Sequence, residues 1–355
     1  MQNALSILIA ILMFGVLIAV HEFGHFFTAK LLGVKVNEFA IGMGPQLFHK
    51  TKGETEYSLR AFPIGGFCAM EGEDEATGDP RSFVVQAGWK KFIILAAGSV
   101  MNFLTGLVLL VILMGQNDYF TLPVVASLEP EFPAQGEDGL MPGDRIVRID
   151  GHMVLLGSDV QMLLNRASDP VDLVIERDGE RIVLNDFLSR QAYSDPDGGT
   201  SLRYGFSIQT VEATPLLCLQ QAMLNSVDFV RLVWMGLVDL VTGAVGLRDL
   251  SGPIGIVDAV GDAGAQAGNV GDALYNVFIF MALIAINLAV MNLLPIPALD
   301  GGRIFFLIVG GLFHLLTRKR LNPKYENWVN AAGFVFLMGL MVVVAASDIL
   351  KLLGV

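Results

Sequence analysis

A short charged motif inside the first apolar stretch constrains this chain more than any other feature. Residues 16–30 read VLIAVHEFGHFFTAK, so two histidines and a glutamate interrupt an otherwise membrane-like segment. Ionisable side chains are costly in a bilayer, and where they occur they generally face a protein interior and serve a function. The stretch therefore predicts a membrane-spanning helix with a functional polar face.

The motif has the spacing of a zinc site. On an α-helix His21 and His25 lie about 40° apart and Glu22 lies about 60° from His25, so all three side chains face one cavity. An H-E-x-x-H motif supplies two imidazole ligands and a carboxylate that acts as general base. The alternative is that both histidines are buried core residues and Glu22 pairs with an arginine. Because buried ionisable clusters in lipid mark functional sites, the motif favours the metal site.

Three further apolar stretches are long enough to cross a bilayer, which requires roughly 20 mostly apolar residues each. The chain is 53% hydrophobic and 16% charged, as expected when lipid replaces water around part of a protein. These features predict an α-helical polytopic membrane protein with four transmembrane helices, at residues 5–31, 92–114, 273–297 and 328–347.

Charge in the connecting segments predicts the orientation. Eight lysines and arginines lie between residues 30 and 91, whereas none precedes the first span. The positive-inside rule places this loop, and the similar basic loop at 301–327, in the cytoplasm. Both termini are then expected outside, with the metal site towards the cytoplasmic side.

Residues 117–271 differ from the rest, with 9 Lys and Arg against 22 Asp and Glu, a net charge of −13. This composition predicts a water-exposed extracytoplasmic region and excludes nucleic-acid binding, which requires basic patches. Within it, residues 216–247 are apolar but interrupted by Asp228, Arg231 and Asp239. We expect segment 211–271 to lie in the membrane interface, although a spanning helix remains the alternative.

Asp300 is the best candidate for a third metal ligand, which catalytic zinc usually requires. It follows Pro295 and Pro297, which end the third span and expose backbone that membranes tolerate only around a cavity. The predicted topology returns Asp300 to the side where His21 and His25 lie. The alternative is a solvated turn residue. His49, His152 and His314 are expected to be surface or packing residues.

With HEFGH and NLLPIPALDG (292–301) in this order, the chain resembles the site-2 protease family of intramembrane zinc metalloproteases, in its bacterial anti-sigma-factor-cleaving branch. Further similar segments are GMGP, PIGGFCAMEGE, LSGPIGI and the pair Gly98 and Asn102. The resemblance implies that His21, His25 and Asp300 bind zinc and that Glu22 is the base. It also implies that Asn292 binds substrate or supports the site.

The resemblance also extends to two β-containing parts. Residues 36–70 are expected to form short strands that dip into the membrane and pair with a substrate strand, with Gly42, Gly44, Gly65 and Gly66 as substrate-binding residues. Residues 139–154, GLMPGDRIVRIDGHMV, resemble the core of PDZ domains and predict a PDZ-like α+β domain at 121–210. A generic β-hairpin is the alternative.

These expectations divide the chain into a first catalytic membrane half (1–116), the inserted domain, the interfacial segment and a second catalytic half (272–355). They predict an endopeptidase that cleaves transmembrane segments of single-pass membrane proteins, such as anti-sigma factors or signal-peptide remnants. Its partners are then that substrate and the lipid bilayer, and its oligomeric state is open. Two alternatives remain: a catalytically silent scaffold that binds through the PDZ-like domain, and an ion or proton transporter.

Overall fold

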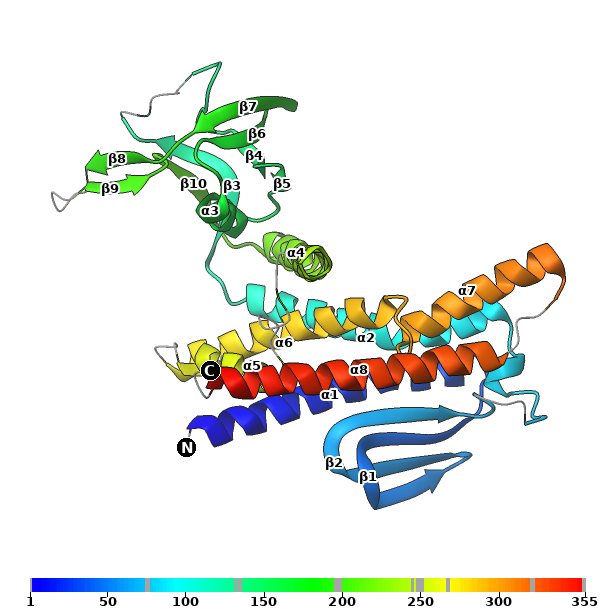
Figure 1. The fold of residues 1–355 in the computed structure, drawn as a ribbon. Helices are drawn as coiled ribbons and strands as arrows, with labels where there is room; N and C mark the ends of the chain where they lie inside the picture. The colour runs from blue at the N-terminus through cyan, green and yellow to red at the C-terminus, as the bar shows by residue number, and fades with distance from the viewer. Residues whose placement is uncertain are drawn as a thin grey trace. The chain divides into compact units, whose positions relative to one another are not determined.

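In a computed structural model, the described residues are 2–73, 77–130, 132, 136–194, 200–243, 246, 252–265, 269–319 and 323–352. The chain forms two compact units (Figure 1). The membrane unit comprises Met1–Leu110 and Phe229–Val355, and the inserted unit comprises Val111–Asp228.

Long apolar helices dominate the membrane unit. They are α1 (Gln2–Leu31), α2 (Gly88–Met114), α6 (Val270–Leu293), α7 (Asp300–Thr317) and α8 (Pro323–Leu352), with the shorter α5 (Pro253–Ala265) before α6. Each predicted span falls on one of these helices, although α6 ends at Leu293 because two prolines follow.

Among the described residues, five helices are long and apolar enough to cross a membrane, so the predicted count of four is not confirmed. The additional candidate is α7, which lies where the cytoplasmic loop 301–327 was expected. The basic residues at 318–320 and 324 suggested a loop, but the apolar run before them continues helically as far as Thr317.

Glycines allow the helices of the membrane unit to approach closely. A Cβ atom on Gly24 of α1 would lie 2.5 Å from the carbonyl oxygen of Ala97 in α2. A Cβ atom on Gly106 of α2 would lie 3.0 Å from the carbonyl oxygen of Ala282 in α6. Small residues at such crossings let helix backbones pack tightly where no hydrophobic effect drives association.

Residues 36–70 form one bent hairpin, and its two strands are longer than the short strands expected. Its strands are β1 (Val36–Lys52) and β2 (Thr55–Met70). Residues 36–41 of β1 pair with 66–70 of β2 on one side and with 56–59 of β2 on the other, and residues 46–52 of β1 pair with 55–60 of β2. The spatial order is therefore 46–52, 55–60, 36–41, 66–70. The bends coincide with Gly42, Gly44 and Gly65, whose φ angles of 85°, 85° and 89° favour glycine. This folding leaves residues 66–70 as an edge strand.

The inserted unit contains an antiparallel sheet in the order β10-β3-β4-β6-β7, with β5 beside β4. The elements are β3 (Tyr119–Leu128), β4 (Arg145–Ile149), β5 (His152–Met153), α3 (Gly157–Arg166), β6 (Val171–Arg177), β7 (Glu180–Leu188) and β10 (Phe206–Glu212). A separate hairpin joins β8 (Gln191–Ser194) to β9 (Thr200–Arg203). Along β4, Ile146 and Ile149 are buried, whereas Arg145 and Arg148 are exposed.

Helix α4 (Pro215–Thr242) occupies most of the apolar segment 216–247, which lies within the region 211–271 predicted to be interfacial. It is not among the candidate spans, and residues 244, 245 and 247 of that segment lie outside the described chain. Its polar residues Gln221 and Asp228 are buried, whereas Leu216 and Trp234 are exposed. A helix at a water-exposed surface buries apolar side chains and exposes polar ones, so α4 shows the opposite pattern. Interfacial placement remains a prediction.

Gly106→Leu should destabilise the membrane unit, because the new side chain overlaps α6 and overpacking typically costs about 1–3 kcal/mol. Gly339→Leu in α8 is the matched control, since a Cβ atom there meets nothing within 4 Å. Thermal unfolding in detergent should show a lower midpoint for Gly106→Leu alone. Equal midpoints for both variants would contradict this packing of α2 against α6.

Candidate metal centre

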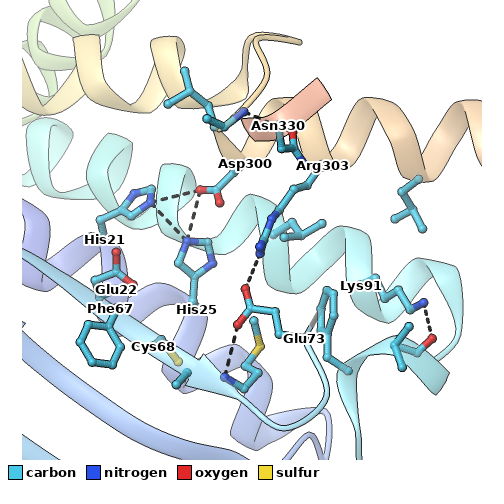
Figure 2. A pocket seen from close by; sticks show the side chains of 18 residues that line it. His21, Glu22, His25, Phe67, Cys68, Glu73, Lys91, Asp300, Arg303 and Asn330 are labelled. Atoms are coloured by element: carbon cyan, nitrogen blue, oxygen red, sulfur yellow. Dashed lines mark hydrogen bonds and ion pairs between the residues drawn. The ribbon is translucent and has the colours of Figure 1, made fainter. Parts of the chain in front are cut away.

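Three ligand atoms from two distant parts of the sequence meet inside the membrane unit (Figure 2). Nε2 of His21 lies 3.2 Å from Nε2 of His25, and Oδ2 of Asp300 lies 3.1 Å and 3.2 Å from these two nitrogens. The side chains are 12%, 8% and 18% exposed, respectively. The three predicted ligands therefore form a nearly equilateral, largely buried triangle.

The turn between α6 and α7 places Asp300 in this triangle. Pro295 and Pro297 follow α6, and Asp300 is the first residue of α7. Gly301 and Gly302 make the turn possible, because a Cβ atom on either would collide with the carbonyl oxygen of Leu294 or Ile296. The motif LDGG is thus a structural requirement for the ligand position.

Helix α2 orients both imidazoles. Nδ1 of His25 lies 2.8 Å from the carbonyl oxygen of Ile94 and must donate to it, which leaves the lone pair on Nε2 free for a metal. Nδ1 of His21 lies 3.4 Å from the side-chain amide of Asn102, which is 1% exposed and whose Oδ1 has no hydrogen-bond partner. An amide oriented with Oδ1 towards Nδ1 satisfies both groups and gives His21 the same tautomer.

The triangle fits a zinc ion. Ligand atoms of a tetrahedral zinc with bonds of about 2.0–2.1 Å are about 3.3 Å apart. The observed separations are close to this value. Oδ2 of Asp300 is buried without a hydrogen-bond donor, and it faces the lone pair of at least His25. A cation between the three atoms would satisfy all of them.

Gly98 of α2 provides the space for that cation. A Cβ atom at this position would overlap Nε2 of His25 and lie 2.8 Å from Nε2 of His21. The absent side chain therefore leaves room immediately beside both metal-binding nitrogens. The pair Gly98 and Asn102 accordingly has a defined role here: one residue supplies space and the other supplies an orienting amide.

Glu22 lies beside the triangle and lines the same cavity, which has a volume of about 860 Å³ (Figure 2). Gly66 of the edge strand makes room for it, because a Cβ atom there would lie 3.4 Å from Cγ of Glu22. The cavity is also lined by residues 67–70 of that strand. A peptide backbone can therefore lie beside both the metal ligands and the predicted base.

Cys68 also lines the cavity but is no candidate nucleophile. Burial, reinforced by the charges of Glu22 and Glu73, raises the pKa of its thiol well above the usual value. The thiolate is the reactive form of cysteine, so a raised pKa disfavours Cys68 as a nucleophile. Glu22 is the carboxylate that the H-E-x-x-H motif assigns as base.

The other histidines do not join the site. Among the described residues, the only group of three or more metal-binding side chains that could hold an ion is His21, His25 and Asp300. His49 and His314 are exposed, on β1 and α7, and His152 belongs to the inserted unit. The sequence-based preference for Asp300 as the third ligand agrees with this geometry.

The predicted substrate-binding residues occupy different places. Gly66 faces Glu22, whereas Gly42, Gly44 and Gly65 form the hairpin bends. Asn292 lies in the last turn of α6 and is not among the residues that line the cavity. Their roles remain predictions. Sequence analysis missed the ion pair between Glu73 and Arg303 in the cavity, although Arg303 lies one helical turn after Asp300.

A buried His₂Asp triangle with an adjacent glutamate, set among apolar helices, is the arrangement expected of a membrane metalloprotease centre. The sequence model that describes peptidase family M50 matches residues 9–340 of the chain. The chain therefore belongs to this family of site-2 proteases. Zinc is its metal, and the chain is a multi-pass membrane protein of a zinc metalloprotease family.

Bacterial relatives named "putative zinc metalloprotease" are similar over nearly the full length. One from Clostridium perfringens is 38% identical over 347 residues, covering 97% of this chain and 98% of the relative. One from Clostridium acetobutylicum is 37% identical, covering 97% of each. One from Fusobacterium nucleatum is 32% identical, covering 98% of this chain and 99% of the relative.

Gly98→Ala should reduce zinc binding, because the added methyl group overlaps the metal-binding nitrogen of His25. Gly88→Ala, at the start of α2, is the control, since a Cβ atom there meets nothing within 4 Å. Zinc content of purified protein, measured by elemental analysis, should fall only for Gly98→Ala. Full zinc content in that variant would show that the imidazoles do not bind metal in this arrangement.

Proposed function

We propose that this chain is an intramembrane endopeptidase that cleaves transmembrane segments of single-pass membrane proteins, including anti-sigma factors or signal-peptide remnants. The observation that carries the proposal is the ligand triangle with Glu22 beside it, in a cavity enclosed by apolar helices and one strand edge. Together these features combine a hydrolytic centre with a place for extended peptide.

The residues of this chain divide the chemistry. Zinc, when bound by His21, His25 and Asp300, supplies Lewis-acid polarisation and lowers the pKa of water. Glu22 accepts the proton of the attacking water and returns it to the leaving amine. The carbonyl group of Ile94 holds His25 in the tautomer that keeps its Nε2 unprotonated. Asn102, with its amide oxygen turned towards Nδ1 of His21, would do the same for His21.

The edge strand at 66–70 supports a mode of substrate binding. A helical substrate buries its carbonyl groups in its own hydrogen bonds, so it must unwind before it can be cleaved. An unwound segment needs new partners for its backbone in a low-dielectric environment. The edge strand can supply these backbone partners by β-augmentation. Its residue Gly66 lies against Glu22, so a segment paired there would lie near the base.

The remaining assignments follow from the same proposal. The loop charges favour termini outside the cytoplasm and a metal site towards the cytoplasmic side of a bacterial inner membrane. The inserted unit, with the strand pattern that suggested a PDZ-like domain, binds or filters the extracytoplasmic part of substrates. It contributes no residue to the metal triangle.

Two substitutions separate the base from the ligand. Glu22→Gln should retain zinc and lose about 10²-fold to 10⁴-fold in cleavage rate, because it removes a positioned base while keeping size and polarity. Asp300→Asn should lose zinc itself, because it removes the anionic ligand. The measurements are zinc by elemental analysis and cleavage of one transmembrane substrate by purified protein.

Either of two results would count against the proposal. Normal cleavage by Glu22→Gln would reject the metalloprotease mechanism. Wild-type zinc affinity in Asp300→Asn would reject Asp300 as the third ligand. Wild-type protein that holds zinc but cleaves no transmembrane substrate would instead favour a binding scaffold.

A further inference from the structure

An ion pair inside the cavity is not used by the catalytic mechanism. Nη1 of Arg303, on α7, donates to Oε1 of Glu73, which follows the edge strand (Figure 2). Both side chains line the cavity that contains the metal triangle. Arg303 lies three residues after Asp300, about 4.5 Å further along the helix axis. The pair therefore joins two walls of the cavity close to the metal ligands.

Glu73 is positioned relative to the edge strand. Its Oε2 accepts a hydrogen bond of 3.4 Å from the backbone N–H of Met70, the last residue of β2. The carboxylate of Glu73 is thus fixed at the end of the edge strand. A substrate peptide that pairs with residues 66–70 would therefore lie at a defined distance from this carboxylate. One side chain of that peptide would lie near the carboxylate.

The contact with Arg303 is exchangeable. The side chains are 34% and 22% exposed, so water reaches both partners. Ion pairs that solvent reaches typically contribute a factor of about 5 or less to an equilibrium constant. A second cation could thus take the place of Arg303 at little cost, whereas a fully buried pair would resist such an exchange.

We propose that Glu73 is a specificity subsite for a basic side chain of the substrate, and that Arg303 occupies it when no substrate is bound. The inference rests on the proposed proteolytic function and extends it to substrate selection. Transmembrane segments carry lysine and arginine at their cytoplasmic flank. A metal site towards the cytoplasmic side would meet these residues, so the ligand of Glu73 is a guanidinium or ammonium group.

The experiment compares transmembrane peptides that carry either arginine or glutamine at successive positions on one flank of the cleaved bond. For wild-type protein, arginine at one position should raise kcat/KM by about 1.5-fold to 5-fold over glutamine, as expected for one solvent-accessible ion pair. In Glu73→Gln the kcat/KM values of the arginine and glutamine peptides should become equal. Glu73→Lys should instead favour a peptide with glutamate at that position. Arg303→Gln should increase the ratio, because it removes the internal competitor.

Glu71→Gln is the matched control. Glu71 lies two residues before Glu73 but does not line the cavity, and hydrogen bonds from Thr77, Lys35 and Asn37 lower its pKa to about 2. It is therefore a fully charged carboxylate outside the proposed subsite. Glu71→Gln should leave the arginine-to-glutamine ratio at the wild-type value.

The ratio distinguishes recognition from a merely structural ion pair, because misfolding would lower the cleavage of both peptides together. The proposal is overturned if Glu73→Gln keeps the wild-type ratio. It is also overturned if wild-type protein cleaves the neutral peptides without any preference, a result that leaves the proteolytic function intact. Zinc-loaded wild-type protein that cleaves none of the peptides would overturn both proposals.

Discussion

The rest of the membrane unit depends on one electrostatic requirement, the convergence of three electron-rich ligand atoms in an apolar interior. Two imidazole nitrogens and a carboxylate oxygen lie 3.1–3.2 Å apart. Without a proton or a metal cation among them their lone pairs would repel one another, and a zinc ion would accept all three as ligands. A divalent ion together with Asp300 and Glu22 gives a net charge of zero, which a low dielectric favours.

Three glycines allow the ligand atoms to come this close together. Gly24 lets α1 approach α2, Gly98 leaves space at the metal ligands, and Gly301 allows the turn that presents Asp300. The carbonyl group of Ile94 and the amide of Asn102 then fix the imidazoles from the same helix. Helix α2 contributes no ligand, yet its surface determines both the geometry of the site and the room available to it.

Much of the site could be predicted from the sequence because its signals are local. The motif around His21 fixes two ligands and the base on one helix face, and the prolines before Asp300 mark a break at membrane depth. The Glu73–Arg303 pair gave no such signal. Its partners are 230 residues apart, and only the folded cavity brings them together.

The fold was predictable to a similar extent. Long apolar stretches located the helices, but α7 was taken for a loop because charge near its end outweighed its hydropathy. The β element was expected as short strands, since glycines usually interrupt strands. In the structure the same glycines bend two long strands, and this bend creates the edge at 66–70 beside Glu22.

X-ray absorption spectroscopy at the zinc edge tests the central claim most directly, because it reports the ligand atoms themselves. The account predicts one zinc per chain, bound by two imidazoles and further nitrogen or oxygen atoms at about 2.0–2.2 Å. A sulfur neighbour at about 2.3 Å would contradict it, since that distance would make Cys68 a ligand in place of Asp300.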